Sequence, residues 1–229
     1  MTDNWNSGVS DNWTNGSDWS TGSPPASSDS ATIAAAGTFT VTIDSSVAAD
    51  SLTINDAGAT VADTNGGTLA ITDTLAINAG TFLLGAGSTL SGGTVSLGSS
   101  GIFVADGGTL SGVTFQGTLN LNAANASLYA AGDLNVEAAD GGSGTINLTG
   151  NEAALIYTES ATLDNVTVDL GSLDGSYLDG ESGTLTLGPG TNLVQSGAAA
   201  YLGGYVNNQA FVNLGTITAG YSRGYFSIG

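Results

Sequence analysis

The stretches GSTLSGGTVS (residues 87–96) and GGTLSGVTFQ (residues 107–116) align without a gap at a spacing of 20 residues. In both, apolar residues alternate with small polar residues over a few positions, which is typical of short strands that bury one face. Glycines between these strands supply the tight corners that turns need. A repeat of about 20 residues made of strands and glycine corners predicts a solenoid, in which each coil buries its apolar face by stacking on the next.

The same short alternation returns along most of the chain, and no window of a dozen residues keeps the apolar spacing of a helix without an interrupting glycine. We therefore expect an all-β fold of about ten coils. A β-sandwich is the alternative, because some strand spacings are as short as the roughly 8–12 residues typical of that fold. The alternating segments lie at residues 39–43, 52–54, 69–71, 75–77, 95–97, 102–104, 113–115, 119–121, 134–136, 146–148, 166–170, 185–187 and 212–214.

The chain is strongly acidic, with 20 Asp and Glu residues against a single basic residue, Arg223, and a formal net charge of −19. Nucleic acids and anionic lipid headgroups are bound through clustered Lys and Arg, so the composition excludes both as partners. No run approaches the roughly 18 apolar residues that a membrane-spanning helix needs, and we expect no membrane insertion of this segment. Cations and basic partners are compatible with the charge.

Histidine, cysteine and lysine are absent from the chain. Their absence excludes Ser-His and Cys-His nucleophile systems, zinc sites with His or thiolate ligands, and Schiff-base chemistry. Two kinds of carboxylate chemistry stay open, namely a glycosidase with paired Asp/Glu residues and a calcium site with oxygen ligands. We expect that no cofactor is required, and calcium is the candidate metal.

All three tryptophans, Trp5, Trp13 and Trp19, lie in the first 19 residues. The first coil of a solenoid would expose an apolar cross-section and unpaired strand edges, so a terminal segment is expected to cover them. We predict that residues 1–36 form an N-terminal cap and the segment leading into the coils, and that residues 37–229 form the coils. The strand-like C-terminal pattern favours a fragment whose coils continue further; a complete protein exported without an N-terminal signal is the alternative.

The tryptophans belong to a longer pattern, W-x7-W-x5-W-x2-G-x-P, which is followed by Asp29, Ala31, Ile33 and VTIDSSVAADSLTI at residues 41–54. This pattern resembles the start of β-helical domains in large bacterial surface proteins, namely autotransporter passengers, filamentous-haemagglutinin-like exoproteins and giant repetitive adhesins. Two later stretches, SGTLTLGPGTNLVQSG and NNQAFVNLGTITA, are similar to the N-x-GTI coils of the same group; they lie at residues 182–197 and 207–219. The resemblance implies a right-handed parallel β-helix, displayed or released outside the cell, and brings no active-site motif with it.

From the repeat and the resemblance together, we expect a structural and adhesive module of a large bacterial surface or secreted protein, located outside the cell or on its surface. It would act as a rigid stalk or contact surface and not as an enzyme. Its partner would be a protein or glycan on a host or neighbouring cell. The alternative is a polysaccharide-active β-helix with paired Asp/Glu carboxylates, because residues one coil apart stack about 4.8 Å apart and form pairs easily.

The acidic stretch at residues 164–182 is the candidate calcium site. Calcium takes six to eight oxygen ligands, and loops that carry several carboxylates supply them. The spacing matches neither the EF-hand loop nor the calcium-binding nonapeptide repeat, and Asp-Gly pairs usually mark turns, so ordinary turn residues are the competing interpretation. The candidate ligands are Asp164, Asp169, Asp174, Asp179 and Glu181.

Aromatic residues gather near the C-terminus and admit two interpretations. They could form a surface that contacts sugar or protein, since tyrosine joins an apolar ring to a polar hydroxyl. We favour larger core fillers in wider coils, or a seam toward further coils. These residues are Tyr201, Tyr205, Phe211, Tyr221, Tyr225 and Phe226.

Thr-x-Thr motifs recur at residues 38–42, 72–74, 184–186 and 216–218. Ranks of such threonines can mark ice-binding solenoids, but threonine is also common on any exposed strand. Because these motifs do not recur at one position per coil, we do not expect a flat regular array.

Overall fold

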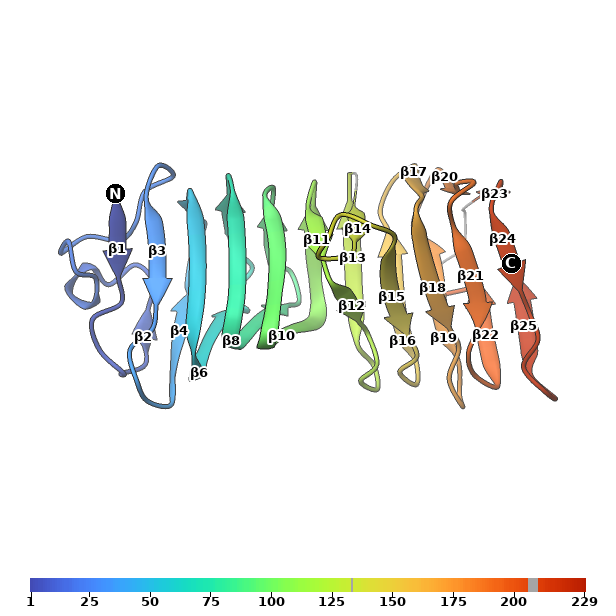
Figure 1. Cartoon of the computed structure of the whole chain (residues 1–229), viewed down its shortest axis with the longest axis horizontal. Coiled ribbons are helices and arrows are strands. Elements are labelled where there is room, and N and C mark those ends of the chain that lie inside the picture. The colour runs from blue at the N-terminus through green and yellow to red at the C-terminus, as the bar shows by residue number, and fades with distance from the viewer. Residues whose placement is uncertain (133, 206–209) are drawn as a thin grey trace. The chain divides into compact units, whose positions relative to one another are not determined.

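In a computed structural model, the chain folds as a parallel β-solenoid of about nine turns, close to the expected number (Figure 1). The structure describes residues 1–132, 134–205 and 210–229. Within those residues the single helical segment is the 3-10 turn η1 (Gly16–Asp18). No helix in the described part of the chain is long and apolar enough to cross a bilayer. The ladders between strands are parallel, so the all-β solenoid prediction is confirmed and the β-sandwich alternative is wrong.

The chain divides into two compact units, residues 1–114 and 115–229. In the first unit the first coil contributes to two parallel ladders and each later coil to three. The long strands β6, β8 and β10 bend at corners so that each joins more than one ladder. In Figure 1, β3, β6, β8 and β10 lie side by side. The strands of this unit are β1 (Thr2–Asn4), β2 (Asp11–Asn12), β3 (Ser30–Ile33), β4 (Phe39–Ile43), β5 (Val47–Ala49), β6 (Ser51–Asp63), β7 (Thr68–Ile71), β8 (Thr74–Gly85), β9 (Thr89–Ser91) and β10 (Thr94–Ser111), and β11 (Thr114–Gln116) spans the boundary.

The register of the first unit follows the sequence repeat. The two stretches that align in the sequence also stack on each other, with residues 89–91 paired to residues 109–111. At some other points of this unit the number of residues per coil is slightly larger, for example where Leu52 pairs with Leu75. The first step, from Thr2 to Ser30, is longer still because the tryptophan-rich loop lies within it. Residues 2–4 and 30–33 of the predicted cap segment already belong to a ladder, and the proposed boundary at residue 36 stays a prediction.

The second unit has the same architecture with longer coils. Its ladders join β12, β15, β18, β21 and β24, then β13, β16, β19, β22 and β25, and then β17, β20 and β23. The step varies from coil to coil: it is longer between Thr118 and Thr145 than between Thr145 and Thr167. The bounds of these strands are β12 (Thr118–Asn120), β13 (Ser127–Ala131), β14 (Asn135–Glu137), β15 (Gly144–Leu148), β16 (Ala153–Tyr157), β17 (Ala161–Leu163), β18 (Val166–Leu170), β19 (Ser176–Gly180), β20 (Thr184–Leu187), β21 (Asn192–Gln195), β22 (Ala199–Leu202), β23 (Ala210–Asn213), β24 (Thr216–Thr218) and β25 (Tyr225–Ile228).

The longer coils correct one expectation about register. A uniform period equal to that of the two aligned stretches would place the strand around residue 186 above the strand around residue 168. Instead Thr186 pairs with Thr162, and Val168 pairs with Leu193, on a different ladder. Loop residues inserted between strands lengthen each coil without disturbing the strands themselves, and loops tolerate such insertions at small entropic cost.

Inward-facing residues form apolar rows that run from coil to coil. Each fully buried leucine contributes roughly 1.5–3 kcal/mol by leaving water, and only the neighbouring coils provide that burial. The corners are tight: a Cβ at Gly101 would overlap the carbonyl oxygen of Ile77 in the coil below. One such row is Leu69, Leu90 and Leu110, and another is Leu128, Leu155, Leu178 and Leu202.

Asp63 interrupts an apolar row in the first unit. It pairs in register with Ile43 in one coil and Leu84 in the next. Its side chain is fully buried, and among the described residues neither carboxyl oxygen has a hydrogen-bond partner. Burial raises the pKa of Asp63 above its ordinary value of 3.8, and the nearby Ser88 hydroxyl opposes that shift in part. Ionising a buried carboxylate that has only the Ser88 hydroxyl nearby is costly, so ionisation of Asp63 destabilises the first unit.

The pH dependence of stability tests this account. Because the folded-state pKa of Asp63 is raised, its contribution is fully favourable below pH 3.8 and is lost as pH rises through the folded-state value. In wild type, the free energy of unfolding should therefore fall as pH rises above 3.8 through the raised folded-state pKa. Asp63→Asn should abolish this fall and be more stable than wild type at pH 7. Urea unfolding followed by circular dichroism between pH 3.5 and 8 measures both. Asp106→Asn, at an exposed carboxyl of the same unit, is the matched control, and identical pH profiles for both variants would contradict the prediction.

Candidate functional site

The five acidic residues predicted as a calcium site lie on separate turns and strands of the second unit. The structure places Asp164 in the turn before β18, Asp169 on β18, Asp174 in the turn before β19, Asp179 buried on β19, and Glu181 just after β19. Their regular spacing along the chain therefore alternates between strand and turn and does not carry them to one point.

Asp164 and Asp169 accept hydrogen bonds from neighbouring segments. Asp164 Oδ1 accepts from the backbone N–H of Asn165 at 2.9 Å and from that of Gly190, one coil later, at 2.7 Å. Asp169 accepts from the Ser196 hydroxyl at 3.2 Å. Asp164 therefore holds its own turn and ties two coils together, and Asp169 is an outward strand residue that bonds to the next coil.

Asp174 and Asp179 also accept hydrogen bonds from backbone and side-chain donors. Asp174 accepts from the Asn151 amide at 2.9 Å. Asp179 accepts from the backbone N–H of Gly180 at 2.7 Å and from that of Tyr205 at 2.6 Å. In the part of the chain that the structure describes, no three Asp, Glu, His or Cys side chains converge to hold a metal ion. The calcium site and the paired-carboxylate site stay predictions.

The three tryptophans form one buried cluster in the first coil. The ring of Trp19 meets the rings of Trp13 at 4.8 Å and Trp5 at 5.2 Å, with interplanar angles of 65° and 87°. The Trp19 indole N–H donates to the backbone carbonyl of Trp13 at 2.7 Å. Edge-to-face contacts of this kind add about 0.5–1.5 kcal/mol per pair to the burial itself.

The segment that carries Trp19 lies along β1 on the side away from β3. Ser20 N–H donates to the carbonyl of Asn4 at 2.9 Å, and Asn6 N–H donates to the carbonyl of Asp18 at 2.7 Å. An antiparallel bridge joins Trp5 and Trp19. The edge of β1 therefore has backbone partners on both sides.

Three tyrosines of the second unit lie on the ladder that contains β19, β22 and β25, and a fourth, Tyr205, follows the end of β22. Tyr177 pairs in register with Tyr201, and their rings stack at 4.8 Å with an interplanar angle of 13°. Tyr205 tilts against Tyr177 at 5.0 Å, and Tyr225 tilts against Tyr201 at 5.9 Å. Tyr205 and Tyr225 are 47% and 58% exposed. We call these four residues the tyrosine face.

One carboxylate contacts the tyrosine face, and a second one lies near Tyr129. The Tyr177 hydroxyl donates to Glu152 at 3.4 Å. Partial burial, and secondly the Glu152 charge, raises the pKa of Tyr177. The pKa of Tyr129 is raised in the same way by partial burial and then by the charge of Glu181. Both glutamates are exposed, and Glu152 places an acidic group beside the rings of the tyrosine face.

The favoured interpretation of the C-terminal aromatic residues as core fillers is wrong for Tyr205, Tyr221 and Tyr225, whose side chains are exposed. The seam toward further coils stays a prediction, and Phe211 and Phe226 are half-buried in the last coil. The first three residues of NNQAFVNLGTITA, at positions 207–209, lie outside the described residues.

Sequence reasoning missed Tyr177, although a signal was present. Tyr177, Tyr201 and Tyr225 recur at equal intervals along the chain, and this interval is longer than the assumed period, which conceals it. Sequence reasoning also missed Tyr157, which is the kind of core filler that was expected elsewhere. Tyr157 is buried on β16, and burial raises its pKa.

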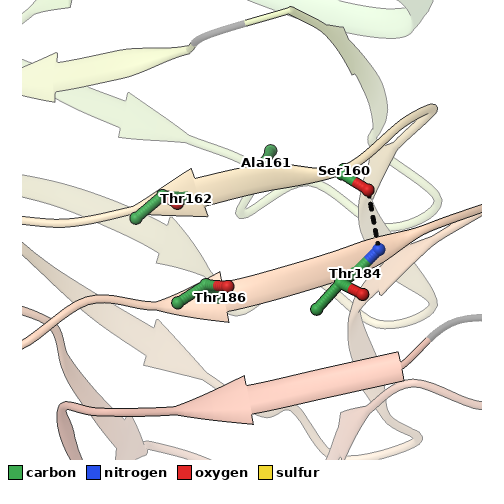
Figure 2. Close-up of a pocket in the computed structure, with 5 residues that line it drawn as sticks. All are labelled: Ser160, Ala161, Thr162, Thr184 and Thr186. Carbon is green, nitrogen blue, oxygen red and sulfur yellow. Dashed lines mark hydrogen bonds between the residues drawn. The ribbon is translucent and has the colours of Figure 1, made fainter.

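A shallow hollow of about 250 Å³ lies on the outer face of the ladder that joins β17 and β20. Figure 2 shows Thr162 and Thr186 side by side on these two strands. The backbone N–H of Thr184 donates to the Ser160 hydroxyl at 3.1 Å, so this polar group of the hollow already has a hydrogen-bond partner within the chain. The lining residues are Ser160, Ala161, Thr162, Thr184 and Thr186, none of them charged.

The Thr-x-Thr motifs lie on different ladders, as expected: residues 40–42 on β4, residues 184–186 on β20 and residues 216–218 on β24. Columns of hydroxyls do occur at other positions. Thr118, Thr145 and Thr167 stack in successive coils. Beside this column runs a second one with Asn120, Asn147 and Asp169, whose amide and carboxylate groups break any uniform hydroxyl array.

No family model, no curated protein and no solved structure matches this chain. The resemblance to β-helical exoproteins therefore stays an expectation based on the motifs quoted above.

A double-mutant cycle tests whether the tyrosine stack holds adjacent coils together. Tyr177→Leu and Tyr201→Leu should each lower the free energy of unfolding, and together they should lower it by less than the sum, with a coupling energy of about 0.5–1.5 kcal/mol. Urea unfolding followed by circular dichroism gives the values. The cycle of Tyr177→Leu with Tyr221→Leu serves as control and should show no coupling. Equal coupling energies in the two cycles would refute a specific stack.

Proposed function

We propose that this chain is a structural and adhesive module of a large bacterial surface or secreted protein, serving as a rigid stalk and contact surface outside the cell. The observation that carries the proposal is the tyrosine face, exposed on a stack of coils joined by parallel ladders. Tyrosine is enriched at protein interfaces because it adds a large apolar area and a hydroxyl at low entropic cost. The partner is a protein or glycan on a host or neighbouring cell, and no cofactor is required.

The ladders support the mechanical half of the proposal. Within each unit, a coil is joined to the next through strands on two or three sides, so a load is shared among several ladders at once. Repeats that contact only their nearest neighbours make extended surfaces on which weak contacts can multiply. A large negative charge keeps such molecules apart in solution.

Two finer features belong to the same proposal. The solenoid is right-handed, because parallel strand connections in one sheet are right-handed in roughly 98% of cases. The tryptophan cluster is an N-terminal cap: the buried indoles cover the apolar end of the first coil, and residues 18–20 occupy the edge of β1. An occupied edge prevents pairing with strands of other molecules.

Substitution of the cap distinguishes capping from ordinary burial. Trp13→Ala and Trp19→Ala should each lower the free energy of unfolding by about 3–5 kcal/mol. They should also cause aggregation under native conditions, measured by light scattering, because the end of the first coil becomes exposed. Leu90→Ala, at a buried site in the middle of the first unit, is the control: it should destabilise comparably without aggregation. Equal aggregation of all three variants would remove the capping role.

An adhesion assay tests the function as a whole. Beads coated with the chain should be retained on bacterial or eukaryotic cells under flow, and retention should fall when the exposed rings are removed in the variant Tyr205→Ser/Tyr225→Ser. Beads coated with the variant Tyr221→Ser, which removes an exposed tyrosine outside the tyrosine face, should be retained like wild type. Retention no better than that of uncoated beads on every cell type would overturn the adhesive role.

A further inference from the structure

We infer that two copies of this chain associate through the last coil of the second unit, each presenting the edges of β23, β24 and β25 to the other. The inference concerns assembly and goes beyond the adhesive function proposed above. What carries it is an end surface that combines uncovered strand edges, uncovered core residues and an absence of carboxylate side chains.

The last coil continues the ladders of the second unit. β23 pairs with β20, β24 pairs with β21, and β25 pairs with β22 (Figure 1). Among the residues that the structure describes, no further strand pairs with the opposite edge of these three strands. A strand edge offers a row of unpaired N–H and C=O groups on which another chain can pair.

The apolar core is also open at this coil. Leu202 is buried, and its partner in the last coil, Ile228, is 60% exposed. Leu193 is buried, and its partner Ile217 is only half-buried. Both apolar rows are therefore covered by a following coil up to this point and uncovered beyond it. Removing such residues from water is the dominant favourable contribution to most protein association.

The net charge of the chain does not oppose this contact, because every Asp and Glu residue lies at position 181 or before. Glu181, the last of them, follows β19, and the ladder continues from β19 to β22 and then to β25. Two steps of about 4.8 Å separate Glu181 from the last coil, so carboxylate side chains of two copies would lie at least about 24 Å apart. This separation is about three times the screening length of roughly 8 Å at physiological ionic strength. The one basic side chain of the chain, Arg223, is exposed in the last coil.

Symmetry favours a second copy as the occupant of this end. A two-fold axis across the last coil reverses the direction of its strands, so the edges of the two copies meet antiparallel, an arrangement that edge strands accommodate. Both copies use the same surface, and the assembly closes as a dimer. At the first coil, residues 18–20 already occupy the edge of β1, which disfavours growth from there.

Sedimentation equilibrium of the full chain between about 1 μM and 1 mM tests the inference. Wild type should pass from monomer to dimer and no further. Ile228→Glu and Ile217→Glu should each raise the dissociation constant at least about tenfold, because each would bury a charge in the contact. Circular dichroism spectra check that each variant is folded.

Leu173→Glu is the matched control, since Leu173 is 75% exposed in the turn before β19 of the same unit. It adds the same charge away from the last coil and should leave the dissociation constant unchanged. A wild-type chain that stays monomeric over the whole range, or that grows beyond a dimer, overturns the inference. A Leu173→Glu variant that weakens association as much as Ile228→Glu also overturns it, because the contact then lies elsewhere.

Discussion

Hydrogen bonding between successive coils is the interaction on which the rest of each unit depends. A coil of this chain cannot satisfy its own strands or bury its own leucines, so both requirements fall on its neighbours. The register is therefore held by backbone and core together: a slip of one residue would turn every apolar row toward solvent. The tight corner at Gly101 reflects the same demand, because coils in register bring backbones too close for a side chain.

The near absence of basic residues shapes the surface. With one arginine in the chain, carboxylates take their hydrogen bonds from backbone N–H groups, hydroxyls and amides, as Asp164, Asp169 and Asp174 do. Such contacts tie coils together without neutralising charge. The surface thus keeps an unbalanced negative field, and that field acts with the exposed tyrosines in determining which partners can approach.

The repeat in the first unit was predictable because residues 87–96 and 107–116 share both strand pattern and corner glycines. The longer coils of the second unit were not predictable, since loop length carries no periodic pattern. The unrecognised coil length concealed the stacking of Tyr177 on Tyr201. The acidic residues showed the converse problem. Asp164, Asp169, Asp174 and Asp179 are equally spaced along the chain but lie alternately in turns and on strands. Equal spacing did not bring them together, because residues of a solenoid become neighbours only when their separation matches the length of a coil. The buried carboxyl of Asp63 occupies a position where alternation predicts an apolar residue.

The aromatic residues are divided between the two units in a way that has a spectroscopic consequence. All three tryptophans lie within residues 1–114, and all seven tyrosines lie within residues 115–229. Stacked repeats need not lose structure everywhere at once, because each region opens with its own free energy. Indole emission therefore reports the first coil alone, and phenol emission, which lies at shorter wavelength, reports the second unit alone. The unmodified chain carries two separate optical reporters, one for each half, without any introduced label.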